Sequence, residues 1–110
     1  MAAALAEGET VFADLAELRV KESDRIVAVA RELRRAGVAV DERPDGFVVT
    51  GLGGRAAAGG TVQPEHDHRI AMAGAVLGLW AGDETVVPVA DIATSFPTFA
   101  ETLAALGAAV

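Results

Sequence analysis

Two short charged segments contain the side chains best suited to chemistry. The first, LRVKESDR, places Lys21, Glu22 and Arg25 at the expected start of a helix. The free backbone N–H groups and the dipole of a helix start favour an anion, and a lysine with an arginine offers a point charge and a bidentate fork for phosphate or carboxylate oxygens. Glu22, set among these cations, is a candidate proton donor or acceptor. The plainer alternative is a charged first turn with solvated side chains.

The second segment, EHDHRIAM, carries a similar group. His68 and Arg69 stand directly before an apolar run over residues 70–81. Taken alone, they also fit a simple helix start, with Asp67 as the N-cap and both side chains exposed. Two charged helix starts in one small chain favour anion binding over two unrelated solvated turns.

The residues give weak support for a metal site and none for a nucleotide-binding glycine loop. The chain has no cysteine, which removes disulfides, thiolate catalysis and zinc–thiolate sites. His66, Asp67 and His68 are consecutive, so their side chains should point in different directions, and nothing nearby completes a ligand set. His66 is therefore expected to be a loop residue. The glycines of residues 51–60 do not match a dinucleotide-binding or phosphate-loop spacing, so this segment is interpreted as a linker.

The apolar run over residues 70–81 predicts a buried helix that mounts the second charged segment. It is shorter than the roughly 20 residues that a bilayer requires. Gly82 is expected to end it as a C-cap. Small residues recur on one side and should let another backbone approach closely: Ala71, Gly74, Ala75 and Gly78.

The first charged segment leads into a second helix, ESDRIVAVARELRRAG. Ser23 is expected to cap this helix and Gly37 to end it. Short strands are expected at residues 10–12, 38–40 and 47–50.

A turn with the sequence RPDG separates the last two of these strands. Pro44 restricts φ there, and Gly46 tolerates a positive φ.

The end of the chain repeats its beginning. ETV occurs at Glu9 and again at Glu84, and VARELRRAGVAV, ending at Val40, aligns with FAETLAALGAAV, ending at Val110. Strand, loop, helix, glycine and strand therefore occur twice, which predicts an α/β architecture with units over about residues 1–50 and 60–110, joined by the glycine-rich loop 51–60. The chain is expected to be part of a longer protein.

The composition limits the partners. A formal net charge of −7 argues against a nucleic-acid surface, because phosphate backbones attract a basic face. The start, MAAALAEGE, lacks a basic n-region and is too short and too acidic for a secretory signal. We therefore expect no nucleic acid, no membrane and a cytoplasmic location.

Five segments together resemble a known family: LRVKESDRI, DGFVVTG, DHRIAMAGAVLGL, TSFPTF and LAALGA. In this order they are similar to the C-terminal portion of 5-enolpyruvylshikimate-3-phosphate synthase, and resemble its second class more than the enteric type. The resemblance implies repeated βαβαββ subdomains. It also implies transfer of the enolpyruvyl group of phosphoenolpyruvate to the 5-hydroxyl of shikimate 3-phosphate, with release of phosphate and without a metal or organic cofactor.

The resemblance also implies roles for single residues. Lys21 would bind shikimate 3-phosphate, Glu22 would donate the proton, Arg25 and Arg69 would grip phosphoenolpyruvate, and His68 would lie beside them. Two positions depart from the family pattern: Glu17 replaces a shikimate-contacting asparagine and Thr94 replaces a phosphoenolpyruvate-binding lysine, so neither role carries over.

Three interpretations remain open. The chain is part of the complete enzyme, or a folded module that binds anions weakly or not at all, or part of the related enolpyruvyl transferase that acts on UDP-N-acetylglucosamine. The KESDR and DHRIAM segments favour the shikimate enzyme. The family's other domain and its catalytic aspartate are missing, so the isolated chain is expected to be inactive, and its uncovered apolar surface suggests self-association.

Overall fold

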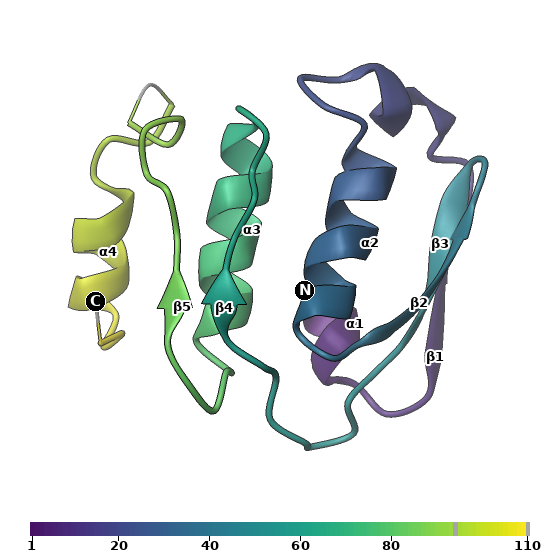
Figure 1. Cartoon of the computed structure of the whole chain (residues 1–110), viewed down its shortest axis with the longest axis horizontal. Helices are drawn as coiled ribbons and strands as arrows, with labels where there is room; N and C mark the ends of the chain where they lie inside the picture. Colours follow the sequence, from purple (N-terminus) through teal and green to yellow (C-terminus); the bar gives the residue numbers. More distant parts are fainter. Residues whose placement is uncertain (94, 110) are drawn as a thin grey trace.

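The computed structural model describes residues 1–93 and 95–109. The described part contains α1 (Ala2–Leu5), β1 (Glu9–Phe12), a 3₁₀ helix (Ala16–Val20), α2 (Arg25–Arg35), β2 (Ala39–Arg43), β3 (Gly46–Thr50), β4 (Gly60–Thr61), α3 (His68–Gly78), β5 (Thr85–Val86) and α4 (Phe99–Ala105). Figure 1 shows α2 between a three-stranded sheet and α3, with β5 and α4 farther along the molecule. The predicted mixture of helices and strands is confirmed.

The three-stranded sheet has the order β1-β3-β2, with both neighbours antiparallel. The expected turn lies between β2 and β3 and includes Pro44 and Asp45. Gly46 does not use its tolerance of a positive φ, because positive φ values among the described glycines do not include it. Glycine is required there by close approach instead: a Cβ would lie 1.9 Å from the carbonyl oxygen of Phe12.

The main core lies between this sheet and α2. Ile26 and Leu33 of α2 are 0% and 3% exposed and pack in one cluster with Phe47 and Val49 of β3. Burying a side chain of this kind stabilises the fold by about 1.5–3 kcal/mol. The core therefore holds α2, and with it the first charged segment, against the sheet.

The two ends of α2 are set by local chemistry. Asp24 is the N-cap and accepts a hydrogen bond from the backbone N–H of Val27 at 3.2 Å. The prediction of Ser23 as the cap is wrong, because its hydroxyl donates instead to Asp67 at 2.7 Å. Gly37 ends the helix as predicted, with φ +88°.

Helix α3 carries the small-residue stripe, but side chains rather than another backbone approach its glycines, and two other expectations for this helix are also corrected. A Cβ at Gly74 would lie 2.5 Å from Cγ1 of Val62, which precedes the helix. A Cβ at Gly78 would lie 2.9 Å from Cβ of Thr85 in β5. Gly82 is not the C-cap, because the helix ends earlier, with Leu79 in that position. The run is also only partly buried, since Leu79 and Trp80 are 49% and 57% exposed.

The last part of the chain is more open. β4 and β5 form a parallel pair, and α4 has no buried residue. Gly107 follows α4 with φ +104°. The strand expected after it is not formed at residues 108–109, and Val110 lies outside the described residues. In the portion of the chain that the structure describes, no helix is long and apolar enough to cross a membrane.

Candidate anion-binding site

Asp67 joins the two predicted charged segments. Its side chain is 0% exposed. One carboxyl oxygen caps α3 by accepting from the backbone N–H of Arg69 at 3.0 Å. The other accepts from Ser23 Oγ at 2.7 Å and from Arg25 Nε at 2.9 Å. The starts of α2 and α3, which are 42 residues apart between Arg25 and Asp67, therefore meet at one buried carboxylate.

The charges at this junction stabilise each other. Burial acts to raise the pKa of Asp67, but the hydrogen bonds from Arg25, Ser23 and the Arg69 N–H outweigh it and hold that pKa below its usual value. The hydrogen bond to Asp67 in turn raises the pKa of Arg25. A buried acid is thus kept as an anion by the cation of the opposite helix.

Arg25 is only partly available to a ligand. Its side chain is 12% exposed, and its Nη2 donates to Glu22 Oε2 and, at 3.4 Å, to Asp67 Oδ1. Among the hydrogen bonds of the described residues, none uses Nη1, so two of the five guanidinium N–H groups remain for an anion.

Lys21 and Glu22 lie on the exposed loop before α2. Lys21 Nζ is 3.6 Å from Glu17 Oε1, a pair that is well exposed to solvent. Glu22 accepts from Arg25, and its side chain is 51% exposed. The departure at Glu17 therefore supplies an internal partner for the predicted substrate lysine.

His68 and Arg69 occupy the first turn of α3. Arg69 is exposed and His68 is half-buried. Within residues 1–93 and 95–109, neither side chain has a hydrogen bond or an ion pair, and the backbone N–H of Arg69 donates to Asp67. These two side chains are therefore the freest of the predicted set, and Arg25 is the most constrained.

Arg19 is a structural residue of the site that the sequence reasoning missed. Its guanidinium donates to the carbonyl oxygens of Pro44 and Arg43 at 2.8 and 2.6 Å, and to the carboxylates of Asp24 and Glu42 at 3.0 and 3.2 Å. It thereby ties the loop that carries Lys21 and Glu22 to the turn between β2 and β3. No local pattern indicates such a partner 25 residues away.

His66 is a loop residue as expected, with a 96% exposed side chain and Nδ1 3.7 Å from Asp91. Thr94 lies outside the described residues. The part of the chain that is described contains no group of three or more His, Cys, Asp or Glu side chains that could hold a metal ion.

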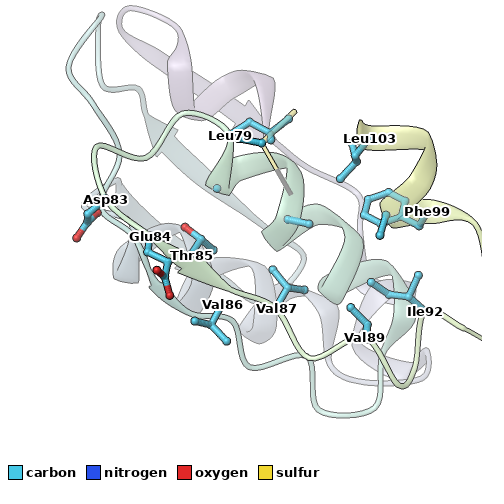
Figure 2. A pocket seen from close by; sticks show the side chains of 14 residues that line it. Leu79, Asp83, Glu84, Thr85, Val86, Val87, Val89, Ile92, Phe99 and Leu103 are labelled. Atoms are coloured by element: carbon cyan, nitrogen blue, oxygen red, sulfur yellow. The ribbon is translucent and has the colours of Figure 1, made fainter. Parts of the chain in front are cut away.

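A separate apolar groove of about 540 Å³ lies between α3, β5 and α4. Figure 2 shows that Leu79 follows α3, Val86 and Val89 come from β5 and the segment after it, and Phe99 and Leu103 come from α4. None of the predicted site residues lines this groove, so it is distinct from the charged junction.

Comparison with known proteins explains the combination of motifs. The family model described as EPSP synthase (3-phosphoshikimate 1-carboxyvinyltransferase) matches residues 1–103. This chain belongs to the EPSP synthase family. The predicted resemblance is therefore confirmed.

Relatives within the EPSP synthase family cover almost the whole chain. The 3-phosphoshikimate 1-carboxyvinyltransferase of Caulobacter vibrioides (strain NA1000 / CB15N) is 50% identical over 98% of this chain and 25% of its own length. That of Pelotomaculum thermopropionicum is 54% identical over 94% of this chain and 24% of its own length. A solved EPSP synthase structure from Acinetobacter baumannii aligns with a TM-score of 0.86 and 42% identity, over 94% of this chain and 25% of that one. The chain thus spans about a quarter of the length of the relatives that it matches.

Proposed function

We propose that this chain supplies one side of the site at which phosphoenolpyruvate transfers its enolpyruvyl group to the 5-hydroxyl of shikimate 3-phosphate, with release of phosphate. The observation that carries the proposal is the buried Asp67 junction, because it holds the starts of α2 and α3 together. Two cationic helix starts in contact suit a ligand that bears both a phosphate and a carboxylate.

Each predicted side chain has a role in this proposal. Arg25, through its remaining N–H groups, and Arg69 bind the anionic groups of phosphoenolpyruvate, and His68 lies beside them. Lys21 binds shikimate 3-phosphate. Glu22 delivers a proton to the methylene carbon as charge develops on the reacting group. No metal or organic cofactor takes part.

Catalysis by the isolated chain is not expected. The relatives are about four times as long, and we propose that the remaining part supplies the other side of the substrate site. Self-association of the isolated chain, a cytoplasmic location and the division into units of about residues 1–50 and 60–110 also stay predictions.

One observation favours the alternative of a folded module with weak or no anion binding. Arg25 already has two carboxylate partners, Asp67 and Glu22, so part of its charge is satisfied without any ligand. Under this alternative the charged segments stabilise the fold and nothing more.

A direct test replaces Arg69, whose side chain has no described partner. We expect phosphoenolpyruvate to shift the backbone NMR signals of residues near Arg25 and Arg69 in the isolated chain, and Arg69→Ala to remove most of this response. In a chimera that carries these 110 residues in place of the matching quarter of the Caulobacter vibrioides relative, the same change should lower kcat/KM for phosphoenolpyruvate by about 30-fold or more, which corresponds to at least about 2 kcal/mol.

The matched control is Arg34→Ala, which removes an exposed arginine of α2 whose side chain, among the described residues, donates to the carbonyl of Val40 alone. If Arg69→Ala behaved like this control in both the titration and the chimera, the alternative of a folded module without anion binding would hold.

A further inference from the structure

The turn at residues 64–67, directly before the junction, has an unusual backbone. The N–H of Asp67 donates to the carbonyl of Pro64 at 2.9 Å, and the two central residues, Glu65 and His66, have φ values of +49° and +61°. Positive φ at both central positions is the signature of a type I′ turn, which favours Asn, Asp and Gly. This turn contains no glycine, so contacts from elsewhere must hold its conformation.

Helix α2 provides these contacts through Arg31. Its Nη1 donates to Glu65 Oε1 at 2.6 Å, inside the turn. Its Nη2 donates to the carbonyl oxygen of Gln63 at 2.7 Å, just before the turn. One planar guanidinium therefore binds two groups of the segment that leads into α3. A lysine has a single side-chain nitrogen and cannot bind both groups in the same geometry.

A buried glutamate reinforces this grip. Glu32 is 1% exposed. Its Oε2 accepts from the backbone N–H of Gln63 at 3.3 Å and lies 3.8 Å from Arg31 Nε. Its Oε1 accepts from Arg35 Nε at 3.2 Å. The backbone N–H and C=O of Gln63 are thus both held by side chains of α2.

These contacts fix the entry to α3 relative to α2. Asp67, the last residue of the turn, is held by Ser23 and Arg25 at the start of α2. Arg31, farther along the same helix, holds the beginning of the turn. Two separate attachments to one rigid helix determine where the first turn of α3, with His68 and Arg69, lies.

We propose that Arg31 is a positioning residue for the anion-binding site: by holding Gln63 and Glu65, it sets the spacing between the cations of α2 and Arg69 on α3. This inference rests on the proposed function. Phosphoenolpyruvate carries a phosphate and a carboxylate, so it needs two cationic groups at a set separation. Inorganic phosphate can be bound by a single cationic group, so its binding should not depend on the distance between the two cationic groups.

The test compares Arg31→Lys with Arg34→Lys in the 110-residue chain. Both changes keep the charge and the helix, and both exchange a guanidinium that donates to a backbone carbonyl for an ammonium. Only Arg31 touches the segment before α3. NMR titrations with phosphoenolpyruvate and, separately, with inorganic phosphate give the two dissociation constants, and a thermal melt of each variant monitors stability.

We expect Arg31→Lys to weaken phosphoenolpyruvate binding on the order of tenfold. The same change should alter the dissociation constant for inorganic phosphate by less than about twofold. Arg34→Lys should change neither dissociation constant. Unchanged phosphoenolpyruvate binding in Arg31→Lys would overturn the positioning role. An equal loss for both ligands, with a lower melting temperature, would overturn it as well, because it would show general destabilisation. If the unaltered chain bound neither ligand, the proposed function would fail for this chain and the positioning role with it.

Discussion

Helices α2 and α4 end in the same way but lie in different surroundings. After α2, the N–H of Gly37 donates to Arg34 and that of Val38 donates to Leu33; after α4, the N–H of Gly107 donates to Ala104 and that of Ala108 donates to Leu103. These are matching Schellman-type caps with a left-handed glycine. Yet α2 buries five residues, and α4 buries none. Local sequence thus sets how a helix ends, whereas burial depends on what lies against it.

The largest expected effect comes from removing a buried leucine of α2, and the aligned leucine of α4 tests whether the two helices differ in burial. Leu33 is 3% exposed in the main core, whereas Leu103, at the aligned position of α4, lines the open groove. Leu33→Ala should lower the free energy of unfolding by about 3 kcal/mol through lost burial and a cavity, and Leu103→Ala by less than about 1 kcal/mol. Urea unfolding followed by circular dichroism measures both. Equal losses would mean that α4 is packed as firmly as α2.

Asp67 connects the α2 region with the α3 region, so its loss should have the next largest effect. Asp67→Asn keeps a helix cap but removes the charge that Arg25 faces, and we expect a loss of about 2 kcal/mol. Ser23→Ala, which removes only the hydroxyl that donates to Asp67, is the milder control and should cost about 1 kcal/mol.

The same carboxylate predicts a dependence on pH. The pKa of Asp67 is lower in the folded chain than its usual value because hydrogen bonds, chiefly from Arg25, outweigh burial. Its stabilising effect is therefore fully present above the unfolded pKa, about 3.9, and is lost as the pH falls toward the lower folded pKa. The difference in unfolding free energy between the unaltered chain and Asp67→Asn should shrink between pH 6 and pH 3. A difference that stayed constant would show that the carboxylate charge does not stabilise the fold.

The sequence predicts the local features of this fold and misses the contacts between distant elements. The turn at Pro44 and the glycine stop at Gly37 are confirmed, because each depends on neighbours along the chain. Ser23 was expected to cap α2 but faces Asp67, 44 positions away. Glycine is needed at position 46 because the backbone there lies close to Phe12. No local sequence preference predicts either contact.

The candidate site follows the same rule. The residue types at Lys21, Glu22, Arg25, His68 and Arg69 indicate anion chemistry from the sequence alone. The supports that hold these segments could not be predicted, because Arg19 and Arg31 act on backbone carbonyl groups 25 and 32 positions away. A carbonyl oxygen is present at every residue, so its use as a partner leaves no mark in the sequence.

The smallest expected effect concerns the two matching helix caps at Gly37 and Gly107. Gly37 and Gly107 both have positive φ and open space around the position of a Cβ, so alanine at either site carries the same local penalty of about 1 kcal/mol. Gly37→Ala should lower the global unfolding free energy by that amount, because α2 belongs to the main core. Gly107→Ala should leave global unfolding unchanged and instead speed amide hydrogen exchange within α4, because a helix with no buried residue opens locally before the core does. Amide exchange measured by NMR in both variants separates the two outcomes. A drop in global stability for Gly107→Ala that matched the drop for Gly37→Ala would show that α4 unfolds together with the core.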